Sequence, residues 1–155
     1  MSRAYRLAAL LAVCFLSACA VAPGQPMIGT WQGEPPGPNV AVPEIVTLTL
    51  YGNPNATSGI YQISTTIRGT NFIGAAGPRL TVWSGRWTRA VELDNGQNRN
   101  IVYLHDALSS NINQWAIGPG NTLQPTNAYL HRNLTPQEIA LYTLRPLSGT
   151  ATLPD

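Results

Sequence analysis

Few side chains in this sequence can do chemistry. The histidines are His105 and His131, and Glu34, Met27 and Asp106 are the side chains that could help them to hold a metal ion. His105 and His131 lie in unrelated segments, without the spacing of a zinc or copper site. On a strand, His105 and Asp106 would point to opposite faces, so they would not form one ligand pair. The sequence therefore predicts surface histidines, no metal site and no cofactor.

Catalysis by a serine or by paired carboxylates is equally unsupported. Ser84 lies in Trp83-Ser84-Gly85, which lacks the glycine that a nucleophile elbow needs two residues before its serine. Seven acidic residues are scattered along the chain, without a local pair that could cleave a glycoside. A Ser-His-Asp triad can be assembled on paper from nearly any chain with two histidines and several acids. We therefore expect that the protein is not an enzyme.

The N-terminal segment indicates export. Two arginines precede an apolar run over residues 7–16, and the small residues Ser17 and Ala18 lead to Cys19. This is the layout of a secretory signal, and the run is too short to span a bilayer as a helix of about 20 residues. The ending Leu16-Ser17-Ala18-Cys19 resembles the lipobox of bacterial lipoproteins.

The lipobox resemblance implies that Cys19 is a lipidation site. In such lipoproteins, cleavage leaves the cysteine as the first residue, and acyl chains such as palmitate hold it in the membrane. Ala20 is not an acidic retention signal, so the resemblance implies a bacterial cell-envelope protein on the outer membrane, facing the periplasm. The alternative is an ordinary secretory signal that happens to end at a cysteine.

Removal of residues 1–18 from the 155-residue chain leaves 137 residues, and the net charge of this remainder differs from that of the whole chain. The formal charge of +2 depends on the two arginines of the signal, and the remainder holds seven arginines, seven acids and no lysine. A neutral domain lacks the basic stripe that nucleic acid requires, so nucleic acid is not an expected partner. Cys14 is lost with the signal and Cys19 takes the lipid, so no disulfide stabilises the domain.

Period-two alternation of apolar and polar residues recurs through the middle of the chain. Val46, Leu48 and Leu50 would share one face of a strand, and the threonines between them the other. Further strand-like runs cover residues 61–67, 80–90, 101–106, 112–117 and 141–145. Polar turns rich in Asn, Gly and Pro separate several of these runs, namely Gly52-Asn53-Pro54-Asn55, Asp94-Asn95-Gly96 and Gly118-Pro119-Gly120-Asn121.

This pattern predicts an all-β fold, a small antiparallel up-and-down barrel. One short helical turn is expected near residues 135–140, because Thr135 can cap it, Pro136 suits its first position and Glu138 completes a capping box. The chain then divides into a signal peptide, a lipidated tether, a β-barrel domain and a flexible tail, at residues 1–18, 19–26, 27–147 and 148–155.

The sequence Gly29-Thr30-Trp31 resembles the Gly-x-Trp that opens lipocalin-like barrels. In those barrels the tryptophan of the first strand packs under a basic residue from the last strand. The resemblance implies that Gly29, Trp31 and Arg145 close the barrel, because closure brings its first and last strands together. A guanidinium over the indole face would contribute about 0.5–2 kcal/mol. The alternative leaves Arg145 as a solvated charge at a strand end.

Several short segments are also similar to the N-terminal domain of NlpE-type copper-resistance lipoproteins. They lie within residues 28–146 and are residues 33–38, 45–50, 59–61 and 84–87. That family carries a Cys-x-x-Cys after its first strand, whereas residues 32–39 contain no cysteine here. The resemblance therefore implies the fold and the location of the family, but not its copper sensing.

Two classes of function stay open. The first is a membrane-anchored binding module for an envelope protein or for a small apolar ligand, which Trp83 and Trp87 could line from one strand face. The second is a periplasmic inhibitor of an incoming enzyme such as a lysozyme, with residues 53–58 or 95–100 as the inhibitory loop. An open apolar cavity would favour the first class, and a filled interior with a rigid polar loop the second.

Overall fold

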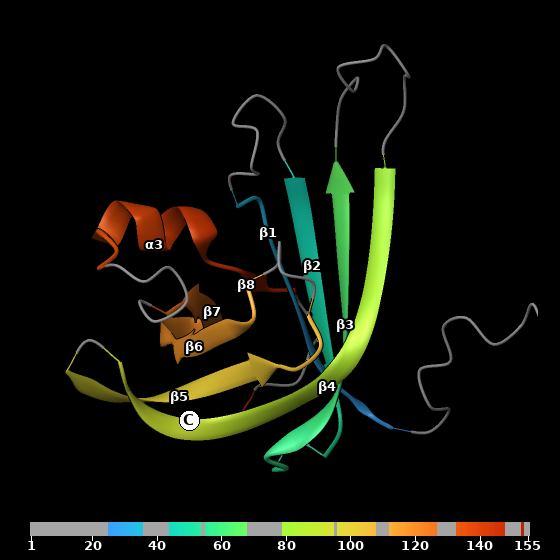
Figure 1. Cartoon of the computed structure of the whole chain (residues 1–155), viewed down its shortest axis with the longest axis horizontal. Helices are drawn as coiled ribbons and strands as arrows, with labels where there is room; N and C mark the ends of the chain where they lie inside the picture. The colour runs from blue at the N-terminus through green and yellow to red at the C-terminus, as the bar shows by residue number, and fades with distance from the viewer. Residues whose placement is uncertain are drawn as a thin grey trace, which may run out of the picture.

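The structure is a computed structural model that describes residues 25–35, 44–53, 55–67, 79–94, 96–107, 112–126, 133–147 and 153. These residues form an antiparallel, nearly closed barrel of eight strands with one short α-helix (Figure 1). The predicted all-β up-and-down barrel is confirmed. Its strands are β1 (Met27–Gly33), β2 (Glu44–Tyr51), β3 (Ser58–Ile67), β4 (Arg79–Asp94), β5 (Gln97–Leu104), β6 (Gln114–Gly118), β7 (Thr122–Pro125) and β8 (Arg145–Pro146).

Strand neighbours follow the order of the chain. The order in the sheet is β7-β6-β5-β4-β3-β2-β1-β8, so that β8 pairs with β1. The ring is completed by a bridge between Leu123 in β7 and Leu144 before β8. The backbone N–H of each of these leucines donates to the carbonyl oxygen of the other at 2.9 Å. This bridge joins the two ends of the sheet, which would otherwise both be edges.

The alternation of β2 becomes the inner and outer faces of the barrel. Val46, Leu48 and Leu50 are buried, and Leu50 and Leu48 stand opposite Tyr61 and Ile63 of β3, which are buried as well. Since directly paired residues point to the same face of a sheet, these side chains all enter one core. The face predicted from the period-two pattern is therefore the face that the barrel buries.

β4 is the longest strand, with 16 residues, and it takes part in two regions of the barrel. Its residues 79–88 pair with β3, and its residues 87–94 pair with β5. Figure 1 shows β4 curving from its first half beside β3 into a second half that runs along β5. Among the described strands, residues 79–86 therefore pair only with β3, residues 87–88 pair with both β3 and β5, and residues 89–94 pair only with β5.

Two predicted turns have the backbone that their sequences favour. Asp94 pairs with Gln97 across a two-residue turn in which Gly96 has φ of +78°, as an Asn-Gly hairpin turn requires. The 3₁₀ turn η1 (Pro119–Asn121) joins β6 to β7 with positive φ at Gly120 and Asn121. Glycine and asparagine are the residues that adopt this left-handed conformation most readily.

The predicted helical turn is α3 (Pro136–Tyr142), which packs against β7. Its capping box is complete, since Thr135 Oγ1 accepts a hydrogen bond from the Glu138 backbone N–H at 3.2 Å. The Glu138 carboxylate in turn accepts one from the Thr135 N–H at 2.9 Å. Pro136 occupies the first turn, where no N–H is needed.

The strand expected over residues 141–145 is wrong for most of its length. The capped helix continues to Tyr142, Leu144 forms a single bridge, and β8 covers Arg145–Pro146 alone. β7 had no counterpart in the sequence prediction, because four residues that end in a proline give little alternation. Leu153, within the segment expected to be a flexible tail, is 2% exposed and belongs to the core.

Candidate functional site

The predicted lipidation site, Cys19, lies outside the described residues. The described chain begins at Gln25, and the Pro26 carbonyl accepts a hydrogen bond from the Gly52 N–H at 2.9 Å. This bond fixes the chain, where it enters the barrel, to the end of β2. In the part of the chain that the structure describes, no helix is long and apolar enough to cross a membrane.

The two ends of the barrel meet, but the predicted cation–π contact does not form in their register. Trp31 stands opposite Pro146, and Gln32 stands opposite Arg145. Since paired residues share a face and successive residues alternate, Trp31 points inward and Arg145 outward. Trp31 is fully buried and its Nε1 donates to the Asn121 carbonyl at 2.6 Å, whereas Arg145 is exposed.

Trp83 and Trp87 share a strand face but not an environment. The pairing of β3 with β4 has no register shift, so both side chains point to the inner face. Trp87 is fully buried, and its Nε1 donates to the Tyr51 carbonyl at 3.0 Å. Trp83 is 38% exposed, and its Nε1 donates to the Asp106 carbonyl at 2.7 Å. Trp87 is therefore a core residue, and Trp83 lies at the end of the core.

Glycines opposite two aromatic side chains let the rings fold over the backbone. A Cβ at Gly59 would lie 2.6 Å from Trp87 Nε1, and a Cβ at Gly85 would lie 2.7 Å from Tyr61 Cε1. The Tyr61 hydroxyl donates to the His105 carbonyl at 3.0 Å. Burial raises the pKa of Tyr61, and the negative charge of Asp106 raises it further.

The interior of the barrel is filled by large side chains whose polar atoms are bonded. Trp31, Trp87, Trp115 and Tyr61 are at most 1% exposed, and Gly29 is buried beside them opposite Leu50. The Trp115 Nε1 donates to the Ile112 carbonyl at 3.0 Å. A ligand that entered this core would have to displace rings that already satisfy their hydrogen bonds. The interior therefore offers little to a small apolar ligand.

The described candidates for metal binding do not gather. His105 is exposed, and its Nε2 lies 2.8 Å from Thr88 Oγ1. No group of three or more His, Cys, Asp or Glu side chains that could hold a metal occurs in the described ranges, and His131 lies outside them. The His105 ring is held in place by Thr88, which leaves its Nδ1 for another partner.

A pocket of about 500 Å³ lies on the outer face of β3 and β4. Ser58 stands opposite Thr88, and Ile60 stands opposite Arg86, so these side chains share the outer face. The His105 N–H donates to the Arg86 carbonyl at 2.8 Å, which brings His105 alongside. Arg86, His105, Ser58 and Thr88 line the pocket, together with Gln25. We call it the Arg86–His105 pocket.

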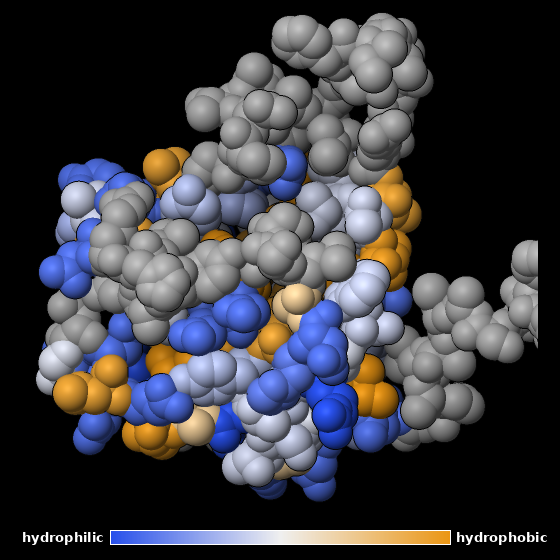
Figure 2. All heavy atoms as spheres, viewed as in Figure 1, coloured by the Kyte–Doolittle hydropathy of each residue, from blue (hydrophilic) through white to orange (hydrophobic). Residues whose placement is uncertain are grey.

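An exposed apolar strip follows the first half of β4. Leu80, Val82 and Trp83 are 65%, 39% and 38% exposed. Figure 2 shows hydrophobic surface along the margin where Figure 1 places this half of the strand. Pairing with β5 begins only at Trp87, and no other described strand covers the edge of residues 79–86. We call residues 79–86 the β4 edge.

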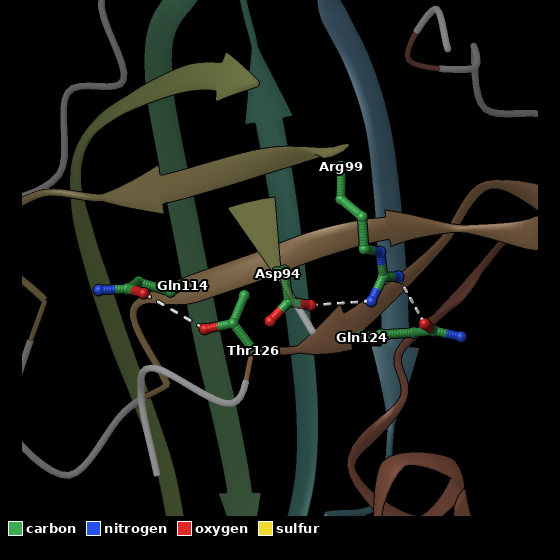
Figure 3. Close-up of polar contacts among 5 residues, drawn as sticks. All are labelled: Asp94, Arg99, Gln114, Gln124 and Thr126. Atoms are coloured by element: carbon green, nitrogen blue, oxygen red, sulfur yellow. Dashed lines mark hydrogen bonds and ion pairs between the residues drawn. The ribbon is translucent and has the colours of Figure 1, made fainter. Parts of the chain in front are cut away.

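The segments considered as inhibitory loops are short and held by hydrogen bonds. Residues 97–100 are the start of β5, and Arg99 donates to Asp94 at 3.1 Å and to Gln124 at 2.6 Å (Figure 3). Nearby, Thr126 donates to Gln114 at 3.2 Å. In the turn before β3, the Asn53 side chain accepts a hydrogen bond from the Asn55 N–H at 3.1 Å.

The sequence did not indicate the Arg86–His105 pocket or the β4 edge. Both depend on which strands pair and where the pairing stops, and neither is a local property of the chain. No protein-family model, no curated protein and no solved structure matches this chain. Its function must therefore be inferred from its own residues.

Proposed function

We propose that the protein is a membrane-anchored cell-envelope lipoprotein whose β-barrel acts as an interaction module for a partner protein. The observation that carries this proposal is the filled interior. Trp31, Trp87 and Tyr61 occupy the space in which a barrel of this type could hold a small ligand, and pockets for such ligands measure about 300–1,000 Å³. Binding is therefore a property of the outer surface.

The β4 edge is the part of that surface best suited to a polypeptide. The Arg89 N–H donates to Thr57 on the β3 side, and the Arg86 carbonyl accepts from His105 on the other side. Because backbone groups alternate along a strand, Leu80, Val82 and Ser84 direct their N–H and C=O groups away from β3. An unpaired edge of this kind is a template for another strand.

The side chains of the β4 edge indicate what kind of segment would pair there. Leu80 and Val82 share the outer face and are exposed, and residues 80–85 carry no charge that would oppose pairing. The proposed occupant is an extended segment of an envelope protein with apolar side chains at alternate positions. Main-chain hydrogen bonds would hold it, and Leu80 and Val82 would select it.

A crosslinking experiment in the native envelope tests this proposal. A photo-reactive residue at position 82 should give one specific protein adduct, whereas the same residue at Leu141, which is 58% exposed on α3, should not. Ser84→Pro should abolish the adduct, because it removes an N–H that points away from β3 while keeping the β3 pairing. Adducts of equal yield at both positions, or one that survives Ser84→Pro, would contradict the proposed interface.

The lipid anchor has its own arm of the experiment. Cys19→Ser should release the protein from membranes or leave the precursor unprocessed, because several acyl chains on one residue anchor a protein more firmly than one chain can. The intact mass of the mature protein should show acyl chains on Cys19. Mature Cys19→Ser protein that stays wholly membrane-bound would contradict the anchor.

Inhibition of an incoming enzyme such as a lysozyme is the second candidate function. It is favoured by the polar surface in which Arg99 joins Asp94 to Gln124 beside the turn of the β4–β5 hairpin. A stoichiometric amount of the protein should then slow lysis of a cell-wall suspension by lysozyme, and Arg99→Gln should restore the lysis. Unchanged lysis at a large molar excess of the protein excludes this function.

A further inference from the structure

We infer that the Arg86–His105 pocket binds a phosphate group, and that in the anchored protein this is the phosphate of a lipid headgroup. The pocket lies on the outer face of β3 and β4 and shares Arg86 with the end of the β4 edge, whereas Leu80 and Val82, which are proposed to select a partner protein, do not line it. The choice of a lipid as the source of the phosphate rests on the proposed membrane anchor. The affinity of the pocket for phosphate itself does not.

The pocket gathers hydrogen-bond donors. Arg86 is exposed, and its guanidinium makes no hydrogen bond or ion pair with another described residue. His105 is held by Thr88 through Nε2, so its Nδ1 is the ring nitrogen left to face a ligand. The Ser58 hydroxyl and the Gln25 amide add two further donors at the rim.

The described lining of the pocket contains no carboxylate, and Asp106, which follows His105 in the chain, is not among the lining residues. Glu92, on the same face of β4, is engaged by the Tyr103 hydroxyl, and Asp94 is paired with Arg99. A cavity with a guanidinium, an imidazole and hydroxyl groups, but no acid, favours an anion over a cation or a neutral ligand.

The arrangement of the donors favours a tetrahedral anion. A guanidinium can bind two oxygens of one anion side by side. The imidazole and the Ser58 hydroxyl come from different strands or turns, so they would reach further oxygens of the same group. The two oxygens of a carboxylate lie in one plane, whereas the oxygens of a phosphate, including a headgroup phosphodiester, are arranged tetrahedrally and can meet donors on different sides.

The position of the pocket points to the membrane as the source of phosphate. Gln25 lines the pocket and lies six residues after Cys19. A chain of that length reaches at most about 20 Å when fully extended. If Cys19 carries acyl chains, the mouth of the pocket stays within this distance of the headgroups. A phosphate bound there would turn one face of the barrel toward the bilayer.

The first experiment measures inorganic phosphate bound to the full mature lipoprotein in detergent, by equilibrium dialysis against acetate as the control anion. Arg86→Gln should weaken phosphate binding by about tenfold to a hundredfold, as expected for the loss of charge-assisted hydrogen bonds. Arg145→Gln is the matched control, since Arg145 is also an exposed arginine but lies outside the pocket, and it should bind phosphate as the wild type does. No measurable binding, or an equal loss in both variants, overturns the inference.

The second experiment distinguishes a lipid from a free phosphate. The lipoprotein is placed in nanodiscs of phosphatidylglycerol or of an uncharged glycolipid that carries no phosphate, and amide hydrogen exchange is followed at residues 58–60 and 86–88. Protection in phosphatidylglycerol that inorganic phosphate reverses supports the headgroup. Phosphate binding without such protection overturns the lipid assignment and assigns a soluble phosphate ester. If the mature protein carries no acyl chains on Cys19, the anchor is contradicted. If that protein still binds phosphate, the phosphate pocket stands.

Discussion

The two halves of β4 each carry a tryptophan on the inner face, and the two tryptophans differ in burial. Trp87, where pairing with β3 and β5 overlaps, is fully buried against Gly59. Trp83, four residues earlier, has Ile63 opposite it on β3, no described strand paired on its other side, and 38% of its surface exposed. A strand in a barrel needs neighbours on both sides before its inner face becomes interior.

The two halves of β4 also differ in what they are expected to contribute, stability in one half and the proposed binding in the other. The half of β4 that pairs with β5 places Trp87 in the core, exposes Val91 and Leu93, and carries on its outer face the polar contacts of Thr88 and of the hairpin that ends at Asp94. In the half that pairs only with β3, Leu80 and Val82 are exposed, and no described strand pairs with the backbone groups that residues 80–84 direct away from β3. We therefore expect substitutions in the second half to change stability and substitutions in the first half to change binding.

The largest effect that tests this comparison is the loss of a tryptophan from each half. Trp87→Ala should lower the free energy of unfolding by about 3–5 kcal/mol, because it opens a cavity in a filled core and leaves the Tyr51 carbonyl without its donor. Trp83→Ala should lower it by about 1 kcal/mol, as is usual for a partly exposed side chain. Urea denaturation followed by circular dichroism measures both values.

Equal losses from Trp83→Ala and Trp87→Ala would break the comparison. They would mean that the first half of β4 is as deeply packed as the second, and the β4 edge would then be an unsuitable binding surface. Trp87→Phe serves as a control, since it keeps most of the ring volume and removes the indole N–H that donates to Tyr51. Its loss should be intermediate between those of the two alanine variants.

The sequence was sufficient where structure is decided by near neighbours. The alternation of Val46, Leu48 and Leu50 indicated the buried face of β2, and the residues around Thr135 indicated the helix cap. The turn before Gln97 followed from its Asn-Gly pair, because few other residues tolerate the backbone that such a turn needs. These features depend on spacings of two to four residues, which a single sequence shows directly.

The sequence was insufficient where distant segments decide. Arg86 and His105 are 19 positions apart and meet because β4 and β5 pair in a particular register. The register between β1 and β8 likewise separates Trp31 from Arg145, since a shift of one residue would bring Arg145 to the inner face. Local alternation indicates which residues of one strand share a face, but not which residue of another strand stands opposite.

A smaller effect concerns the pH dependence of stability in the paired half of β4. Burial, together with a hydrogen bond to Glu92 and the charge of Glu92, raises the pKa of Tyr103 from 10.0 to about 12. Between pH 10 and pH 12 the unfolded chain loses this proton while the folded protein keeps it, so stability falls as the pH rises. Below pH 10 both states hold the proton and the contribution is complete.

Tyr103→Phe should therefore flatten the fall in the urea midpoint between pH 10 and pH 12. Tyr61, whose pKa is also raised by burial, contributes a fall in the same direction, so the Tyr103→Phe profile should be less steep rather than level. Profiles with the same slope in the wild type and in Tyr103→Phe would show that Tyr103 titrates alike in the folded and unfolded states. The Tyr103 hydroxyl would then be more accessible to water than its raised pKa implies.

The smallest effect extends the comparison to the seam between β1 and β8. Trp31 is buried with its Nε1 bonded to Asn121, whereas Arg145 lies on the outer face opposite Gln32. Side chains on opposite faces of a sheet do not share partners, so Trp31→Phe and Arg145→Ala should have additive effects on the free energy of unfolding. The coupling in a double-mutant cycle should not exceed about 0.3–0.5 kcal/mol. A guanidinium stacked on the indole would instead give a coupling of about 0.5–2 kcal/mol. A coupling near the upper end of that range would require β8 to pair with β1 one residue out of the present register, and would then place Arg145 in the barrel rather than at its surface.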